Sequence, residues 1–306
     1  MSGNALKNTV LPLRAGPQGQ ALTEPSAGSK FQPRLPRKIP LAVLVPVLII
    51  AVISICALVP GWVAPFSPTD MDDNAILSAP SFRHLLGTDQ FGRDICSLLI
   101  FGAQRSVEIA VFSIVFSSIV GTSIGLVSGF AGGWIDMVLM RLIDIWMSVP
   151  PMLLALIIAA ALGGSFEAII AAIGSMTLPP FARIIRAQVI AVKARPFVAA
   201  SRALGASPLR VMLQHVLPHI LSQFLVLATL GLGQAILVGA TLSFIGLGVI
   251  DDRPDWGYLL SQGRDYLSDA WWCATFPGLA ITALAVSVNL LGDTLQSRFN
   301  PHHQKR

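Results

Sequence analysis

The stretch FVAASRALGASPLRVMLQHVLP, residues 197–218, is the polar break around which the rest of this chain is organised. It carries Arg202 and Arg210 and contains Gly205 and two prolines, yet it lies between long apolar runs. Crossing a bilayer requires a more apolar segment than this one. The sequence therefore places the stretch outside the membrane, between membrane-embedded regions.

Local signals in this stretch predict two short helices joined at a sharp corner. Pro196 fits the first position of a helix over 197–204, because its missing N–H is not needed there. Gly205 can take the left-handed conformation that ends a helix. Ser207 then supplies an N-cap oxygen, and Pro208 fits the first position of a second helix.

The corner also has the composition of a contact surface. Arg195, Arg202 and Arg210 keep it in water. Its apolar contact surface comprises Phe197, Leu204, Leu209 and Met212. We interpret the segment as a rigid knob that a cytoplasmic protein can bind; an ordinary helical connection is the alternative.

The composition of the whole chain is that of a membrane protein. Of its 306 residues, 54% are hydrophobic and 12% are charged, against roughly a quarter charged in soluble domains. A membrane helix needs about 20 predominantly apolar residues. Five candidate spans satisfy this: 41–60, 109–135, 145–166, 219–239 and 270–292. We expect an all-α membrane protein.

A sixth span is predicted on weaker grounds. The uncharged run 168–182 is short, contains Pro179 and Pro180, and must continue past Arg183 and Arg186, which can snorkel toward an interface. Pro218 is expected to interrupt the longer uncharged run 211–250, so a single helix is placed there.

Charge asymmetry orients these spans. Cytoplasmic segments carry an excess of Lys and Arg, and the first 40 residues hold six basic residues against one acid, Glu24. Six crossings return the basic segments 183–210 and 296–306 to the same side, so both ends are predicted to be cytoplasmic. The acidic residues assigned to the opposite side are Asp70, Asp72, Asp73, Asp89, Asp94, Asp251, Asp252, Asp255, Asp265 and Asp269.

Two rows of small residues predict close helix packing. Gly121, Gly125 and Gly129 repeat every four residues, a pattern that lets membrane helices approach closely. A second such row comprises Gly231, Ala235, Gly239 and Ser243. GTSIG, residues 121–125, also matches a nucleophile pattern centred on Ser123, but that pattern requires a strand-to-helix turn. Packing is therefore favoured over catalysis.

Other polar residues admit two interpretations. His215 and His219 have the spacing of zinc ligands on a helix, but Pro218 is expected to break the intervening turn, so metal binding is disfavoured. Arg141 and Asp144 are neighbours on a helix, and we favour a structural clamp over a functional intramembrane charge.

The polar stretch also resembles part of a known family. AASRALGASPLRVMLQHVLP, residues 199–218, is similar to the cytoplasmic signature of binding-protein-dependent ABC importer permeases, Glu-Ala-Ala, three residues, Gly, then Leu-Pro. Gly205, Leu217 and Pro218 match the signature. The departure is Ala199, where the family usually has Glu.

Further stretches resemble the dipeptide and oligopeptide permeases of that family. These are HLLGTDQFGRDICSLLIFGAQRSV (84–107), ATLSFIGLGV (240–249), PDWGYLLSQGRDYL (254–267) and FPGLAI with NLLGD (276–281 and 289–293). The resemblance covers nearly everything from His84 to Asp293 and implies a type I ABC importer permease fold.

The resemblance implies one half of a translocation path for peptides, in a bacterial inner membrane. The implied partners are a homologous second permease, two cytoplasmic ATPases and an extracytoplasmic solute-binding protein, besides the lipid bilayer; no nucleic acid is implied. The chain lacks the G-x-x-x-x-G-K-[ST] phosphate loop, so we expect no cofactor in it and place ATP and Mg²⁺ on the ATPases. It is not expected to be an enzyme.

The apolar runs and the charge pattern predict a domain organisation, and the resemblance implies a coupling site within it. Residues 1–40 form a flexible basic cytoplasmic tail, 41–60 the first membrane helix, 61–105 an extracytoplasmic segment, and 106–300 the core with a cytoplasmic coupling loop over 190–218. The implied ATPase contacts are Ala199, Ala200, Ser201, Arg202, Gly205, Ala206, Ser207, Leu217 and Pro218.

Three alternatives stay open. The solute can be a non-peptide such as a nickel chelate. An ion-coupled secondary carrier usually needs acidic residues within its spans, and those of this chain fall at their margins. An intramembrane hydrolase rests on GTSIG alone.

Overall fold

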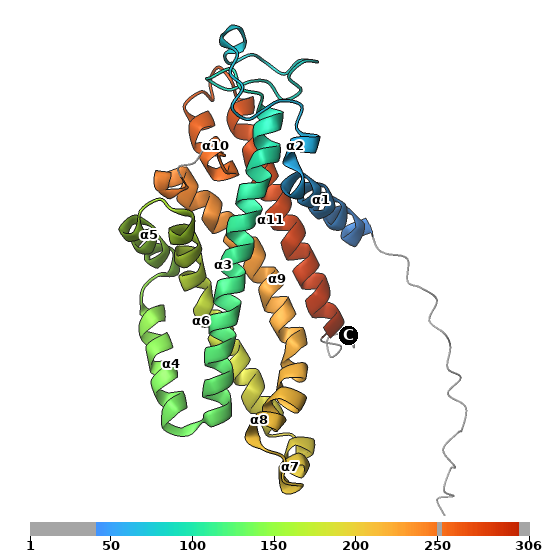
Figure 1. Ribbon diagram of the computed structural model, residues 1–306, viewed down its shortest axis with the longest axis vertical. Helices are drawn as coiled ribbons and strands as arrows, with labels where there is room; N and C mark the ends of the chain where they lie inside the picture. The colour runs from blue at the N-terminus through green and yellow to red at the C-terminus, as the bar shows by residue number, and fades with distance from the viewer. Residues whose placement is uncertain (1–40, 250–252, 300–306) are drawn as a thin grey trace, which may run out of the picture. The chain divides into compact units, whose positions relative to one another are not determined.

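The computed structural model describes residues 41–249 and 253–299, and this part of the chain is helical (Figure 1). The longer helices are α1 (Leu41–Leu58), α3 (Ile95–Ala131), α4 (Gly133–Ser148), α5 (Pro151–Leu162), α6 (Phe166–Lys193), α9 (Leu217–Leu242) and α11 (Trp272–Phe299). The shorter ones are α2 (Pro60–Val63), η1 (Asp73–Ala75), α7 (Pro196–Ala203), α8 (Pro208–Val211), α10 (Trp256–Arg264) and the π-helical turns η2 (Met212–Val216) and η3 (Ser243–Leu247). The basic tail, Asp251 and Asp252 lie outside the described residues.

Four of the described segments are long and apolar enough to cross a membrane. They are α3, α6, the segment Pro208–Leu247 that contains α9, and α11. The pair α4 and α5 makes a fifth if the two count as one broken span, and the apolar helix α1 is shorter. The all-α membrane fold is confirmed, whereas six crossings and cytoplasmic ends stay predictions.

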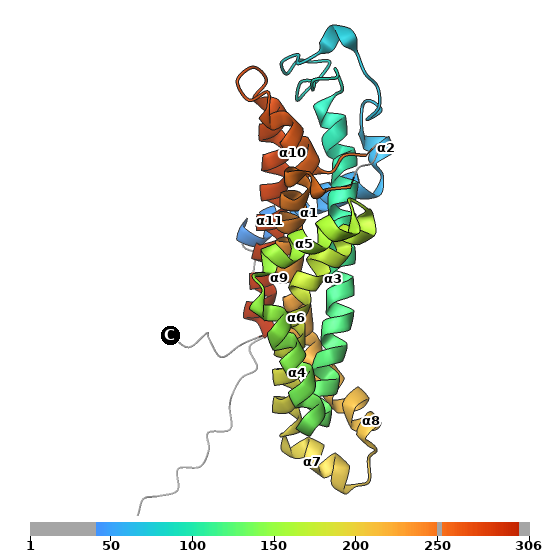
Figure 2. The ribbon, with the colours of Figure 1, turned by 90° about the vertical axis from the view of Figure 1, so that its left-hand side faces the viewer.

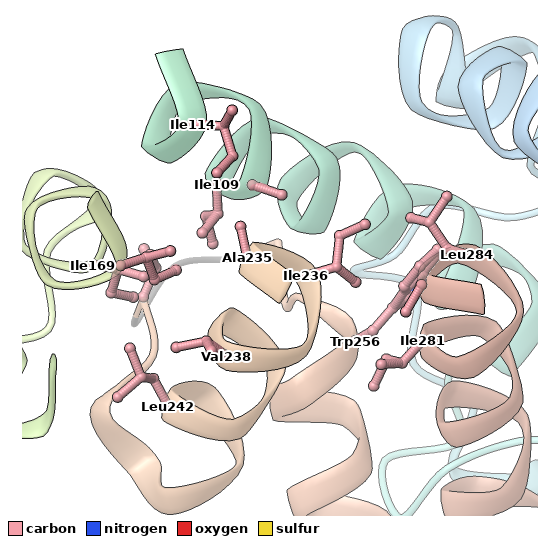
Figure 3. Close-up of a cluster of buried hydrophobic side chains, with 14 of the residues drawn as sticks. Ile109, Ile114, Ile169, Ala235, Ile236, Val238, Leu242, Trp256, Ile281 and Leu284 are labelled. Atoms are coloured by element: carbon pink, nitrogen blue, oxygen red, sulfur yellow. The ribbon is translucent and has the colours of Figure 1, made fainter. Parts of the chain in front are cut away.

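The core is formed where α3, α6, α9 and α11 meet (Figure 3). Ile169 of α6 and Leu242 of α9 are fully buried there, and Trp256 of α10 closes the cluster beside Ile281 and Leu284 of α11. Lipid is as apolar as these side chains, so close packing rather than water exclusion favours the association of such helices.

The glycine row of α3 lies directly against α6. A Cβ on Gly121 would come within 2.7 Å of the Leu178 carbonyl oxygen, and one on Gly125 within 2.6 Å of that of Ala182. A Cβ on Gly129 would meet the carbonyl oxygen of Arg186 at 2.9 Å. The two backbones therefore touch at three positions over about two turns, and the helix that faces this row belongs to the same chain.

The sixth span, which the sequence predicted on the weakest grounds, corresponds to α6 and is the most buried of the candidate spans. α6 has 28 residues, and 72% of its apolar window is buried. Pro179 and Pro180 do not end it. Pro179 lacks the N–H that would pair with the Ser175 carbonyl, and the indole Nε1 of Trp146, from α4, donates to that oxygen at 3.1 Å. A neighbouring helix thus replaces the missing hydrogen bond.

The prediction of one helix over 145–166 was wrong. Two helices, α4 and α5, meet there at 85°. Val149 and Pro150 are extended, with ψ of 131° and 128°, because each precedes a proline, whose ring disfavours helical backbone in the preceding residue.

The predicted break at Pro218 was also wrong. The turn before it is π-helical, and the Leu217 N–H bonds to the Met212 carbonyl. Pro218 then occupies the first turn of α9, where its missing N–H is tolerated. The helical segment is therefore continuous from Pro208 through Pro218 to Leu242.

The ion pair expected within α4 is formed between helices instead. Asp144 accepts from Arg183 of α6 at 2.5 Å, rather than pairing with Arg141. Asp136, in the first turn of α4, accepts two hydrogen bonds of 2.5 Å from Arg186 and one from the Ser128 hydroxyl. The arginines that were expected to snorkel therefore join α6 to α4.

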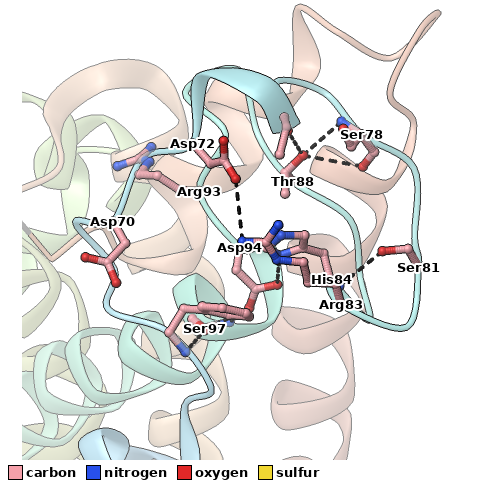
Figure 4. Close-up of polar contacts among 12 residues, drawn as sticks. Asp70, Asp72, Ser78, Ser81, Arg83, His84, Thr88, Arg93, Asp94 and Ser97 are labelled. Atoms are coloured by element: carbon pink, nitrogen blue, oxygen red, sulfur yellow. Dashed lines mark hydrogen bonds and ion pairs between the residues drawn. The ribbon is translucent and has the colours of Figure 1, made fainter.

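A polar network fixes the segment between α2 and α3 (Figure 4). Asp94 caps α3 by accepting from the Ser97 N–H at 2.8 Å, and its other oxygen lies 3.1 Å from His84 Nδ1. The Thr88 hydroxyl donates to the Ala75 carbonyl, while the Thr88 carbonyl accepts from Trp272 Nε1 at 3.1 Å. This segment is thereby fastened to α3 and α11.

Asp255, like Asp89 and Asp94, is a buried member of the acids assigned to the outer loops. It caps α10, accepting from the Tyr258 N–H at 2.9 Å, and it accepts from the Ser243 hydroxyl at 2.7 Å. Burial raises the pKa of this carboxyl, and the two hydrogen bonds oppose that rise. Its role in the fold is to join the end of α9 to α10.

Candidate functional site

Residues 196–211 form the predicted corner. α7 begins at Pro196, and Gly205 follows its end with φ of +85°. The Ser207 hydroxyl accepts from the Arg210 N–H at 3.3 Å, and Pro208 begins α8. The helix, corner and second helix predicted from local signals are confirmed. In Figures 1 and 2 they lie at the end of the helix bundle opposite to the segment 64–94 and α10.

The corner is rooted in a small core of its own. Val198 of α7, Val211 of α8 and Val216 of η2 are fully buried, and they pack with Val189 and Val192 at the end of α6. Because both short helices contribute to one cluster with α6, the corner is held at a fixed orientation to the bundle.

The outer surface of the corner is exposed and partly apolar. Leu204 is 89% exposed and Leu209 60% exposed. Ala199, Ala200, Arg202, Gly205 and Ser207 are exposed beside them, and Ser201 and Ala206 are half-buried. Exposed leucines on a rigid support are suited to contact another protein. Leu217 and Pro218 instead begin α9.

Two histidines, one in η2 and one at the start of α9, contact α7. Phe197 stacks on the His219 ring at a centroid distance of 5.1 Å, and His215 Nε2 lies 3.1 Å from the Ser201 hydroxyl. His219 Nδ1 donates to the His215 carbonyl at 2.7 Å. The sequence offered only a disfavoured metal interpretation for this pair, and among the described residues no cluster of three potential metal ligands occurs.

A further contact, not predicted from sequence, links the corner to the end of α3. Lys193 Nζ donates to the Phe130 carbonyl at 2.5 Å, which caps the carboxyl end of α3 with a positive charge. The Phe130 ring also lies 5.4 Å from Lys193 Nζ and 5.6 Å from the Arg202 guanidinium carbon. Phe130 therefore contacts two cations, Lys193 at the end of α6 and Arg202 within α7.

The alternative catalytic motif has the wrong geometry. Ser123 lies within the continuous helix α3, and its hydroxyl donates to the Ile119 carbonyl at 2.7 Å. A nucleophile of the G-x-S-x-G type instead stands on a strained turn beside a base. The small residues of this motif serve the contact with α6.

Comparisons with known proteins agree with this architecture. Residues 121–305 match the family described as binding-protein-dependent transport system inner membrane component. The chain is 41% identical over 260 residues to the di/tripeptide transport system permease protein DppC of Pseudomonas aeruginosa, covering 83% of this chain and 86% of that protein. It is 34% identical over 255 residues to the glutathione transport system permease protein GsiD of Escherichia coli, covering 83% and 84%.

A solved structure shows the same fold. A chain of the MetNI methionine ABC transporter, in an inward-facing conformation, aligns with a TM-score of 0.54 at 19% identity, covering 67% of this chain and 98% of that one. The fold is that of a type I ABC importer permease.

The chain belongs to the family of inner membrane components of binding-protein-dependent transport systems. It is a multi-pass permease of the bacterial inner membrane, and it is a transport component by family.

Proposed function

We propose that this chain carries peptides across the inner membrane as one permease of an ATP-driven importer. In this proposal the corner 196–211 binds an ATPase and transmits its conformational changes to the membrane helices. Its partners are a homologous second permease, two cytoplasmic ATPases that bind ATP and Mg²⁺, and an extracytoplasmic solute-binding protein. The names of the relatives at 34–41% identity support di- and tripeptides as the solutes.

The observation that carries the coupling role is the corner itself. Leu204 and Leu209 project from a turn whose base is locked by fully buried valines. A flexible loop could move without displacing the helices beside it. The corner packs in one cluster with α6 and α9, so a displacement of the corner also displaces these helices. Ala199 supplies no carboxylate to a partner, so shape and the charge of Arg202 dominate the contact.

The test is uptake by the complete transporter in proteoliposomes. We expect labelled dipeptide to accumulate only with the binding protein outside and ATP at the ATPases, and to be insensitive to a protonophore. Uptake that a protonophore abolishes, and that persists with a hydrolysis-deficient ATPase, would show an ion-coupled carrier instead. Uptake of a metal chelate but of no peptide would replace the proposed solute.

A further inference from the structure

A polar surface on α4 and α6 stands out from the other exposed faces of the described bundle. We call it the α4–α6 strip; it comprises Arg141, Asp144, Pro180, Arg183 and Ala187, all exposed. By contrast, α3 exposes large apolar side chains such as Phe112, Val115 and Ile119. On α6, whose apolar window is 72% buried, the exposed strip residues are Pro180, Arg183 and Ala187, whereas α4 also exposes Leu142 and Ile145 near Asp144.

The ion pair of the strip lies within the depth of the membrane-spanning helices. Gly125 of α3 packs on Ala182 and Arg186, so Arg183 is level with Gly125. Gly125 lies within the uncharged run 109–135 that is predicted to cross the membrane. Charges at such depth face a protein interior or a water-filled cavity rather than lipid.

The surroundings of the pair decide whether it can open. The Asp144 and Arg183 side chains are 47% and 46% exposed although their atoms approach to 2.5 Å. Facing lipid, such a pair would be locked together, because separating it would leave two charges in hydrocarbon. Facing water, an exposed pair contributes little to stability and can open at little cost. A site that must bind and then release a passing solute needs this property.

From these observations we propose that the α4–α6 strip lines the solute passage and that the Asp144–Arg183 pair opens to hold a zwitterionic peptide. The carboxylate of Asp144 would face the peptide ammonium, and the guanidinium of Arg183 the peptide carboxylate. The identity of the solute in this inference rests on the proposed function. The exposure of the strip to water is independent of that function.

The first experiment measures water access in the complete complex in nanodiscs, with the native cysteines replaced. We expect Ala187→Cys to react with a charged thiol reagent about tenfold faster than the apolar-face control Ile119→Cys, since the thiolate forms in water. Millimolar trialanine should slow the reaction at position 187, and trialanine capped at both ends should not. An unreactive Ala187→Cys that crosslinks to the companion permease would overturn the proposal and assign the strip to the interface between permeases.

The second experiment removes the charges. Asp144→Asn combined with Arg183→Gln should lower ATP-driven trialanine uptake about fivefold, because the charged contacts are lost, while basal ATP hydrolysis and complex yield stay at wild-type values. The charge-retaining control, Asp144→Glu with Arg183→Lys, should keep most of the uptake. Wild-type uptake in the amide variant, or loss of uptake together with complex yield, would overturn the role in solute binding. Absence of ATP-driven uptake in the wild type would instead refute the proposed function.

Discussion

The indole Nε1 of Trp146 donates to the carbonyl oxygen of Ser175, which is the carbonyl that Pro179 leaves without its helical partner. The bond, 3.1 Å long, joins α4 to α6 at the level of the Pro179–Pro180 pair. A backbone carbonyl without a partner is costly in a membrane, where water cannot replace the lost donor. This contact explains how α6 continues through two prolines.

Trp146→Phe should therefore destabilise the chain. Hydrogen bonds between membrane helices contribute on the order of 1 kcal/mol, and phenylalanine keeps an apolar ring but removes the donor. Thermal unfolding of the purified complex measures the loss. Trp134→Phe, on the same helix and 73% exposed, serves as the control and should have no effect.

A double substitution isolates the bond. Pro179→Ala restores an N–H at position 179, which can pair with the Ser175 carbonyl, so Trp146→Phe should cost less in that background than in the wild type. An equal cost in both backgrounds would mean that Trp146 stabilises α6 through its ring packing alone.

Gly125→Leu should disrupt the contact between α3 and α6. The added side chain would clash with backbone atoms, since even a Cβ would lie 2.6 Å from the Ala182 carbonyl oxygen and 3.0 Å from the Arg186 nitrogen. Overpacking of this kind typically costs about 1–3 kcal/mol. We expect a lower yield and a lower unfolding temperature. Gly239→Ala is the control, because its Cβ would make ordinary contacts of 3.4 and 3.5 Å; equal behaviour of the two variants would contradict close backbone packing at Gly125.

Phe130→Leu should weaken the attachment of α7, because it removes the aromatic ring while keeping an apolar side chain at position 130. It abolishes the contacts of the ring with Lys193 and Arg202, each worth about 0.5–1 kcal/mol at an exposed site. Hydrogen exchange over 196–203 should become faster, while exchange within α11 is unchanged. Unchanged exchange in α7 would show that the buried valines hold it by themselves.

The corner was predictable because its signals act within a few residues. Pro196, Gly205, Ser207 and Pro208 each specify a helix end locally, and the structure has all four in the expected roles. The span through Pro179 and Pro180 could be predicted only weakly, because its continuity depends on a distant partner, Trp146, which lies 29 residues before Ser175. The break predicted at Pro218 was wrong because the π-helical turn before it lets the helix continue. The pairing of Asp144 with Arg183 likewise joins residues 39 apart, and spacing along one helix could not reveal it.

Membrane orientation can be tested with single cysteines in a background lacking Cys56, Cys96 and Cys273. We expect an impermeant thiol reagent to label Asp73→Cys and Asp265→Cys in intact cells, and Ser207→Cys only after permeabilisation, because all three positions are exposed in the structure. Asp255 is unsuitable, since it is buried. Labelling of position 207 in intact cells would reverse the predicted orientation.

Gly205→Val tests whether the geometry of the corner couples ATP hydrolysis to transport. At φ of +85°, a Cβ on Gly205 would have no neighbour within 4 Å, so the cost of the substitution is backbone strain rather than a clash. That strain is roughly 1–2 kcal/mol for a residue with a Cβ and greater for a β-branched one. Relieving the strain by changing the angle between α7 and α8 would displace Leu204 and Leu209 without altering a membrane span. We expect the two permeases to copurify normally, recovery of the ATPases to fall, and uptake to fall with it. Gly205→Asn is the matched control, since asparagine tolerates this conformation, and it should retain both. If Gly205→Val keeps wild-type ATPase recovery and uptake, the corner is a linker and the coupling contact lies elsewhere.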